Sequence, residues 1–193
     1  MPRVKTFDED QVLEKAMELF WKQGYNATSM QNLVDALGIN RASLYDTFKG
    51  KKELFVRAFQ RYRARSKSFL KETLLPKADI REGFRAVFLA ELEGGEQDCD
   101  SKGCFVVNST TELAPQDEEI TAIVCENRQV VISTFQSYLD YGKKAGQLSP
   151  DKDTLALAHY FFTFFNGLKV ISKLTTPREE LEKMVETALG ALD

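Results

Sequence analysis

The chain has 193 residues, of which 43% are hydrophobic and 28% charged, and its formal net charge is −3. This balance, with only 11 glycines and 5 prolines, is typical of a globular protein with a substantial core and excludes a disordered or linker-rich chain. A single histidine, His159, excludes histidine-rich metal sites, and the sequence has no glycine-rich phosphate-binding motif. We therefore predict that the protein holds no metal and no cofactor.

The sequence also lacks signals for membrane insertion or export. No apolar run reaches the roughly 18 residues of a bilayer-spanning helix, and the first residues form no hydrophobic signal segment. Three cysteines, Cys99, Cys104 and Cys125, are an odd number and make a poor disulfide framework. These features predict a cytoplasmic protein with no membrane partner. They leave open whether the thiols are structural or take part in redox or metal sensing.

The charge is distributed unevenly along the chain. Residues 1–65 carry 12 Lys and Arg against 8 Asp and Glu, whereas residues 66–193 carry 14 against 21. The first third is therefore basic, with a net charge of +4, and the remainder is acidic, with −7. A basic segment on an acidic body indicates that the first third meets a polyanion, although a chance fluctuation of surface charge would give the same pattern.

Apolar residues recur at helical spacing along the whole chain, which predicts an all-α fold. Segments 93–102 and 145–150 have the composition of loops, and Pro76 marks a further break. We divide the chain into a small N-terminal domain, residues 1–50, and a larger helical domain, residues 51–193, whose first long helix links the two and is a natural lever. The predicted helices cover residues 9–23, 30–37, 41–47, 51–73, 79–93, 103–113, 117–145, 151–174 and 177–192.

Two short helices near the N-terminus form a helix-turn-helix pattern. Ser29 is a good N-cap for the helix over 30–37, Gly38 closes that helix, and Asn40 can cap the helix over 41–47. A single α-helix fits the major groove of B-DNA, and the second helix carries hydrogen-bonding side chains suited to that groove. The lysines that follow, Lys49, Lys51 and Lys52, stand where phosphates would flank a docked helix, although Lys49 and Lys52 would also fit an ordinary solvated surface.

The residues around this pattern carry a more specific signal. The chain reads Gly24-Tyr25-x-x-Thr28-Ser29, then Leu44-Tyr45-x-x-Phe48, then Lys51-x-x-Leu54-Phe55. At these spacings the segment over residues 9–56 strongly resembles the DNA-binding domain of the tetracycline-repressor (TetR) family of transcriptional regulators. The rest of the chain is similar to that family in size and helicity. The resemblance implies a DNA-binding helix-turn-helix domain, followed by a helical domain that binds a small effector and forms the dimer.

The resemblance also implies which residues meet DNA. It places Thr28 on a phosphate, and Tyr45 on a phosphate or a thymine methyl group. Two positions depart from the family pattern, because Ala42 stands where glycine is frequent and Asp46 is acidic on a helix that faces DNA. Asp46 would either accept a hydrogen bond from cytosine or pair with a lysine, so the operator sequence stays undefined. The predicted DNA-binding residues are Thr28, Ser29, Asn40, Arg41, Ala42, Ser43, Tyr45, Thr47, Lys49 and Lys51.

The C-terminal part offers candidates for an effector site and a dimer interface. The helix over 151–174 is aromatic on every side, so one face can meet the core and another a second subunit. With the apolar stripe of the last helix it would form a four-helix interface of twofold symmetry. The predicted interface residues are Phe162, Leu181, Met184, Val185, Ala188 and Leu189. A predicted pocket, whose members an ordinary core would explain equally well, comprises Phe84, Phe88, Cys104, Val107, Asn108, Thr111, Cys125, Arg128, Phe161 and Phe165.

Together these features predict a ligand-responsive homodimeric repressor. It would bind a palindromic double-stranded DNA operator and release it when an unidentified small-molecule effector binds. The main alternative is a helical small-molecule carrier with a vestigial DNA-binding domain, which would bind DNA only weakly. An enzyme is poorly supported, because the sequence shows no nucleophile–base pair and no metal cluster, and we assign no catalytic residues.

Overall fold

The computed structural model describes residues 7–97, 102–174 and 176–193, and in these residues it confirms the all-α prediction, with helices and no strand. Two short 3₁₀ helices, Ala114–Gln116 and Gly190–Leu192, join or follow the longer ones. The α-helices are α1 (Glu9–Gln23), α2 (Met30–Leu37), α3 (Arg41–Phe48), α4 (Lys51–Leu74), α5 (Ile80–Gln97), α6 (Phe105–Glu112), α7 (Glu118–Lys144), α8 (Thr154–Ile171) and α9 (Arg178–Leu189).

The helix boundaries lie close to the predicted ones, with one exception. α5 runs on to Gln97, through Gly94 and Gly95, where the sequence predicted a loop from residue 93. A glycine inside a helix costs only about 1 kcal/mol relative to alanine, so two glycines weaken a helix without ending it as a proline would. The loop prediction was therefore wrong over the last turn of α5.

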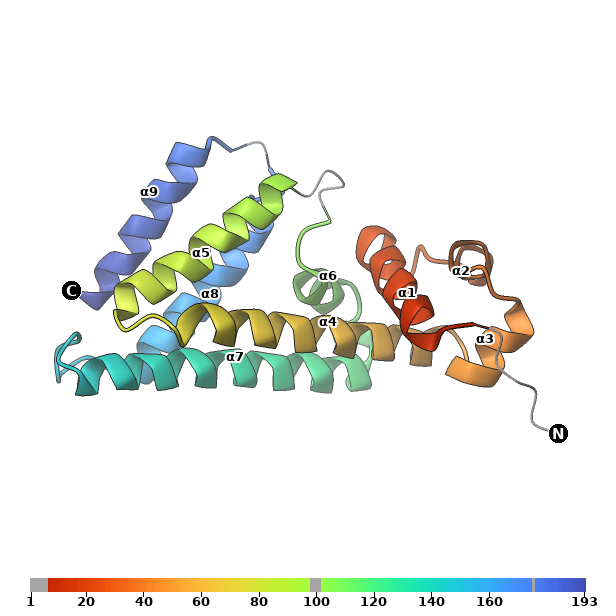
Figure 1. Ribbon diagram of the computed structural model, residues 1–193, viewed down its shortest axis with the longest axis horizontal. Helices are drawn as coiled ribbons and strands as arrows, with labels where there is room; N and C mark the ends of the chain where they lie inside the picture. The colour runs from red at the N-terminus through yellow and green to blue at the C-terminus, as the bar shows by residue number, and fades with distance from the viewer. Residues whose placement is uncertain (1–6, 98–101, 175) are drawn as a thin grey trace.

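Figure 1 shows how the helices are grouped. α1, α2 and α3 lie at one end of the molecule, and α4 runs from that end toward the other with α7 alongside it. α5, α8 and α9 gather over the far half of α4 and α7, and α6 lies between the two groups. α4 is thus a single helix that extends from the N-terminal helices into the C-terminal part.

The N-terminal helices form a hydrophobic cluster that draws on residues far along the sequence. α1 contributes the buried side chains of Met17 and Phe20, which pack with residues of α2 and α3. The first half of α4 completes one side of this cluster, and the rings of Phe55 and Phe105 meet edge to face with centroids 5.5 Å apart. The members that come from beyond residue 50 are Leu54, Phe55, Val56, Ala58, Phe59, Phe105, Leu113 and Ile120.

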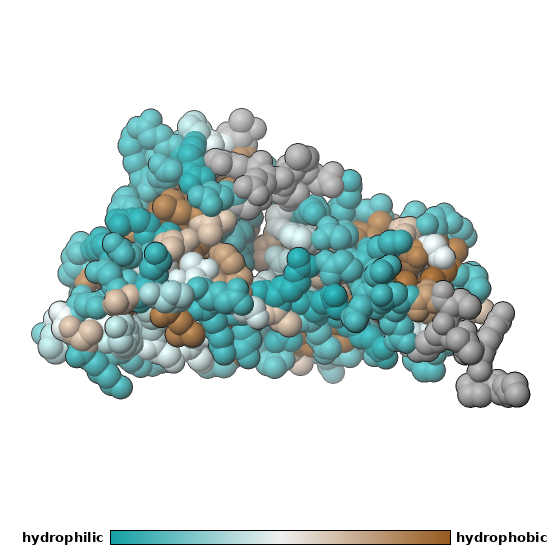
Figure 2. Space-filling view, in the orientation of Figure 1, coloured by the Kyte–Doolittle hydropathy of each residue, from teal (hydrophilic) through white to brown (hydrophobic). Residues whose placement is uncertain are grey.

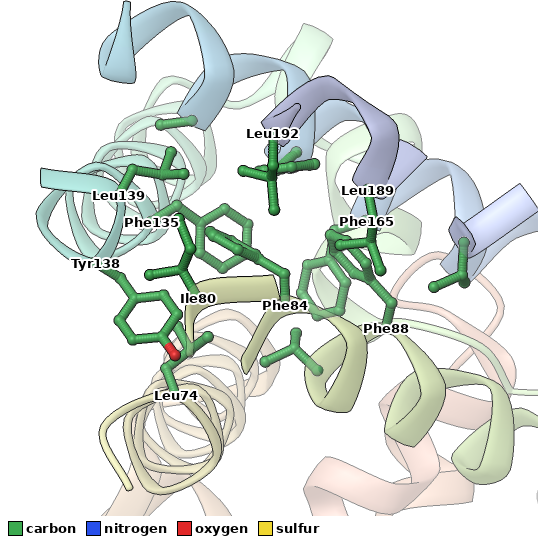
Figure 3. Packing of buried hydrophobic residues seen from close by; sticks show 14 of the residues in the cluster. Leu74, Ile80, Phe84, Phe88, Phe135, Tyr138, Leu139, Phe165, Leu189 and Leu192 are labelled. Atoms are coloured by element: carbon green, nitrogen blue, oxygen red, sulfur yellow. The ribbon is translucent and has the colours of Figure 1, made fainter. Parts of the chain in front are cut away.

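The C-terminal helices share a second hydrophobic cluster, which is rich in phenylalanine. Figure 3 shows aromatic rings from α5, α7 and α8 pointing toward one another, with leucines from the end of the chain closing the same core. The Phe84 ring lies 4.5 Å from that of Phe161 and 5.2 Å from that of Phe135, measured between centroids. Such packing buries much apolar area and fixes α5, α7, α8 and α9 against one another.

The surface is largely polar. On the face seen in Figure 2, hydrophilic residues cover most of the molecule, and hydrophobic ones form small separate patches. Among the described residues, no helix combines the length and the apolar character needed to cross a bilayer.

Candidate DNA-binding interface and effector cavity

The short helix α3 has one buried side and one exposed side. Leu44 and Phe48 anchor it in the N-terminal cluster, with 0% and 1% of their surface exposed. The side-chain oxygen of Asn40 caps its first turn by accepting a hydrogen bond from the N–H of Ser43 at 2.8 Å. On the opposite side Tyr45 is 43% exposed. The helix is therefore held rigidly while its outer face meets solvent.

Arg41, Tyr45 and Lys49 follow one another at four-residue spacing on this outer side. The guanidinium of Arg41 lies 5.9 Å from the centre of the Tyr45 ring, so a cation and an aromatic ring stand next to each other. The Lys49 ammonium donates a hydrogen bond to the main-chain oxygen of Asp46 at 3.2 Å, and not to its carboxylate. Two cations with a polarisable ring between them suit contact with a nucleic acid.

The turn between α3 and α4 fixes the position of Tyr45. Lys49 and Gly50 both have positive φ, 60° and 129°, and the value at Gly50 is one that residues with a side chain rarely adopt. A Cβ built on Gly50 would lie 3.3 Å from Cε1 of the Tyr45 ring. Glycine at position 50 therefore permits both the turn and the close approach of the ring.

The N-terminal end of α2 is capped by two reciprocal hydrogen bonds, and the residue before the cap differs from its predicted role. Ser29 and Asn32 form a capping box, in which each side chain bonds the backbone N–H of the other residue. Thr28 is fully buried, and its hydroxyl donates to the carbonyl of Gly24 at 2.6 Å. The prediction that the Thr28 side chain touches a phosphate is therefore wrong, because its hydroxyl holds the α1–α2 turn together.

The two lysines that open α4 have different surroundings. The Lys51 ammonium lies 4.2 Å from the centre of the Tyr25 ring, and partial burial lowers the pKa of this amine. The Lys52 ammonium pairs with Asp117 at 2.8 Å and with Glu119 at 3.1 Å, and hydrogen bonds to these two carboxylates raise its pKa. Lys52 thus links α4 to the start of α7, and its contact with a phosphate stays a prediction.

The other predicted DNA-binding residues lie near α3. On this helix the Ala42 side chain is exposed, and Ser43 and Thr47 are half-buried. The side-chain oxygens of Ser29 and Asn40 are already engaged as helix caps, so these two residues position the helices. The structure therefore brings Arg41, Ala42, Ser43, Tyr45, Thr47 and Lys49 together around one short helix.

A cavity of about 550 Å³ lies between the two parts of the molecule. Its walls come from α4, α5, α7 and α8, from Val106 of α6 and the segment that precedes α6, and from a single residue of α1, Trp21. Apolar side chains such as Val130, Val131 and Phe162 form much of the lining. A mainly apolar hollow with a few polar groups is the usual form of a small-molecule site.

Charged groups converge at one side of this cavity. Lys169 of α8 lies 3.9 Å from the Glu91 carboxylate, 3.6 Å from the Cys104 sulfur and 4.0 Å from the centre of the Phe165 ring. Burial raises the pKa of Glu91 although the lysine opposes the change. Burial also raises the pKa of Tyr62, whose hydroxyl lies 3.7 Å from the Cys104 sulfur. Charged and polar groups thus stand next to apolar side chains at this side of the cavity.

Most of the predicted pocket residues lie elsewhere. Of the set, Phe165 is in the cavity wall, while Cys104 and Asn108 lie next to wall residues without lining the cavity. Val107 is half-buried outside the lining, and Thr111 is exposed. Cys99 falls outside the described residues. The prediction was wrong for Phe84, Phe88 and Phe161, which fill the core, and for Cys125 and Arg128, which are exposed on α7.

The predicted dimer interface also needs correction. Leu181, Val185, Ala188 and Leu189 are buried within their own protomer, where the α9 stripe packs on α5 and α8. Figure 3 shows Leu189 beside Phe88 and Phe165 in that core. Met184 packs partly buried against the same core and Phe162 lines the cavity, but both keep some exposed surface, so their place in an interface stays a prediction. A regular apolar stripe shows that a helix face is buried, but it does not show in which subunit.

Sequence reasoning missed most of the cavity wall, including its tryptophan and two of its charged residues, Trp21, Glu91 and Lys169. Two of them carried a detectable signal. Lys169 is the one lysine in the apolar helix α8, and Glu91 follows Phe84 and Phe88 on the inward face of α5 at helical spacing. Trp21 could not be recognised from the sequence, because no local pattern indicates that α1 contacts the C-terminal part of the chain.

Comparisons with known proteins agree with this geometry. Residues 12–58 match the family model of bacterial regulatory proteins of the tetR family, and residues 82–188 match the tetracyclin repressor-like C-terminal domain. The first match covers the helix-turn-helix and the start of α4. The second covers most of the helices that enclose the cavity.

Individual relatives extend over the whole chain. The chain is 32% identical over 194 aligned positions to YezE, an uncharacterized HTH-type transcriptional regulator of Bacillus subtilis, with 100% of both chains covered. It is 30% identical to the HTH-type transcriptional repressor ComR of Escherichia coli, over 97% of this chain and 90% of ComR. A cysteine mutant of the TetR family regulator CifR, solved in complex with 26bp double-strand operator DNA, aligns with a TM-score of 0.89 and 30% identity over 99% of this chain and 100% of that one. The chain therefore belongs to the TetR family, whose members are DNA-binding transcriptional regulators and not enzymes.

Proposed function

We propose that the protein is a homodimeric repressor that binds a palindromic operator in the cytoplasm and leaves it when a small molecule occupies the cavity. The observation that carries this proposal is the outward row of Arg41, Tyr45 and Lys49 on a short capped helix whose other side is buried. A helix held in this way can enter the major groove, where side chains reach base edges while neighbouring groups hold the phosphates.

Within this proposal each residue around α3 has a role. Arg41, Ala42 and Ser43 open the recognition helix and face bases, with Arg41 suited to the paired acceptors of guanine. Tyr45 contacts a phosphate or a thymine methyl group. Thr47, Lys49 and Lys51 make the remaining contacts, which are to the sugar-phosphate backbone of the DNA.

The proposed dimer forms through the exposed face of α8. TetR-family regulators work as dimers. Tyr160, Thr163, Gly167 and Val170 follow at spacings of three and four residues, and Val170 is 49% exposed. A Cβ built on Gly167 would meet nothing within 4 Å, so the backbone there is open to a partner helix. Two copies paired by a twofold axis would present two α3 helices, which is why the proposed operator is a palindrome.

The proposed effector is a small apolar molecule with one anionic or hydrogen-bond-accepting group. The cavity lining includes Arg65, Lys67, Lys102 and Lys169 against a single carboxylate, Glu91. Apolar side chains form much of the remaining wall. The apolar part of such a ligand would lie against the apolar wall, and its hydrogen-bond-accepting group would lie near Lys169.

The test is selection of bound sequences from a random pool of double-stranded DNA at about 0.15 M salt, which suppresses binding through phosphates alone. We expect a palindrome whose half-sites are about one helical turn apart. A carrier with a vestigial DNA-binding domain would recover no sequence above background. Full-strength binding of a single half-site by a monomer would contradict the dimer.

A further inference from the structure

Trp21 stands in the wall of the cavity although it belongs to α1, in the DNA-binding part of the chain. Its indole ring meets Tyr62 of α4 edge to face, with centroids 4.9 Å apart. Any molecule that fills the cavity near this ring therefore touches the DNA-binding helices themselves. Its effect need not travel through the length of α4.

The segment just before α6 links the cavity to α1 by three contacts. The indole N–H of Trp21 donates to the main-chain oxygen of Gly103 at 2.6 Å. The Lys102 ammonium lies 4.5 Å from the centre of the Trp21 ring and 2.9 Å from the Glu18 carboxylate. Lys102 and Gly103 are also wall residues of the cavity. The same residues thus hold α1 and border the space that a ligand would occupy.

The C-terminal end of α6 makes a second contact with the DNA-binding part of the chain. The Glu112 carboxylate accepts hydrogen bonds from the backbone N–H groups of Tyr25 and Asn26, at 3.0 and 2.7 Å. These residues form the turn that leads from α1 into α2. A Cβ on Gly24 would lie 2.9 Å from this carboxylate, so the turn can approach Glu112 because residue 24 is glycine. α6 therefore contacts the helix-turn-helix at both of its ends.

We infer that Trp21 is an effector-contacting residue, and that an occupant of the cavity lowers operator affinity by competing with the Trp21–Gly103 hydrogen bond and the Lys102 contacts. This inference rests on the proposed function. A ligand shifts an equilibrium only by the difference in its affinity for two states. Here the two states differ in whether the segment at Lys102 and Gly103 holds α1, and the Glu112 contacts carry the change to the turn before α2.

The chain provides its own reporter, because Trp21 is its single tryptophan. The probe is 8-anilinonaphthalene-1-sulfonate, a fluorescent apolar anion that matches the lysine-rich, largely apolar cavity. Because the efficiency of energy transfer falls steeply with distance, near-complete transfer from the indole to the bound dye requires the dye to lie close to Trp21. We expect near-complete transfer in the unmodified protein, and we expect the dye to weaken binding of the selected operator duplex about tenfold, within the usual range of allosteric coupling.

Two variants test the role of the contacts. Trp21→Phe removes the indole N–H, and Lys102→Met removes the ammonium but retains the tryptophan. Both variants remove a wall group, so we expect them to bind the directly excited dye more weakly; at saturating dye we expect the coupling to be lost, so that the dye changes operator affinity less than about twofold. Lys15→Met, on an exposed position of α1, is the matched control and should respond as the unmodified protein does. Lys102→Met keeps the test valid if Trp21→Phe does not fold.

Three results would overturn the inference. They are dye fluorescence with only weak transfer from Trp21, near-complete transfer without any change in operator affinity, and a full response in both variants. Failure of the proposed function looks different, because the unmodified protein would then select no duplex. The energy-transfer measurement needs no DNA, so it decides independently whether a bound molecule lies against Trp21.

Discussion

The ring of Tyr45 lies against the backbone of Gly50, and a Cβ at residue 50 would be 3.3 Å from the Cε1 atom of that ring. Position 50 also has a φ of 129°. We therefore expect Gly50→Ala to destabilise the protein by about 1–3 kcal/mol through backbone strain and to displace Tyr45, which would lower operator affinity. Urea denaturation and operator titration would measure the two effects.

Gly146 is the matched control for this change. It has a φ of +74°, and a Cβ there meets nothing within 4 Å. Gly146→Ala should cost stability through strain alone and leave operator affinity unchanged. Equal operator affinities for Gly50→Ala and the unmodified protein would show that the turn does not position Tyr45 for DNA.

Tyr45 itself is the sharpest test of the recognition helix. Tyr45→Ala should weaken operator binding about 10- to 100-fold, because a good side-chain contact is worth about 1–3 kcal/mol. Stability should change little, since the side chain is 43% exposed. Fluorescence anisotropy with labelled duplex measures the loss. Tyr141→Ala, at a tyrosine 47% exposed on α7, is the control and should bind as before.

The proposed dimer predicts the effect of a charge on α8. Val170→Glu would place two carboxylates near the twofold axis, so we expect dissociation into monomers and a loss of operator affinity with it. Sedimentation at several protein concentrations measures the association state. Lys183→Glu, on the exposed side of α9, should leave the dimer intact. A monomeric Lys183→Glu protein, with a dimeric Val170→Glu protein, would move the interface to α9.

The raised pKa of Glu91 gives a prediction about pH. Its ordinary value is 4.5 and burial raises the pKa in the folded state, so the folded protein binds this proton more tightly than the unfolded chain. Stability from this group is therefore present below the ordinary value and is lost as pH rises through the folded-state pKa. We expect Glu91→Gln to remove that loss, which denaturant midpoints over a pH series would show. If the stability of both proteins fell equally as pH rises, Glu91 would not be the source of the loss.

The two described cysteines should differ in reactivity. Cys125 is exposed on α7, whereas Cys104 is buried behind Tyr62 and Lys169. Iodoacetamide should therefore label Cys125 at least tenfold faster under native conditions, and unfolding in urea should bring the two rates together. Peptide mapping by mass spectrometry follows each site. Equal native rates would mean that the wall around Cys104 opens readily.

The N-terminal helices could be predicted from sequence because their signals are local. Ser29, Gly38 and Asn40 act as caps and stops in the structure as they do in the sequence pattern. The buried set of Leu33, Leu44 and Phe48 follows from helical spacing alone. Where a feature depends on a few consecutive residues, local physical chemistry is sufficient.

The cavity could not be predicted in the same way because it depends on distant contacts. Phe84 and Phe165 are both apolar residues on inward faces, yet only Phe165 borders the cavity. Thr28 has the residue type of a phosphate contact, but its hydroxyl is engaged by Gly24. The apolar stripe of α9 indicates burial equally well within one protomer or between two. Such choices are decided by tertiary packing and not by the pattern along the chain.

The continuity of α4 limits how far the DNA-binding part can be treated as a module. Its hydrophobic cluster is completed by Leu54, Phe55 and Phe59, and by Phe105 from α6. A fragment that ends at residue 50 would leave Phe20, Leu44 and Phe48 uncovered, and we expect it to aggregate and not to fold. Chimeras that exchange recognition helices between relatives must therefore keep the first half of α4 and α6 together with the helices they support. Specificity for DNA and the response to a ligand would then be exchanged as one unit.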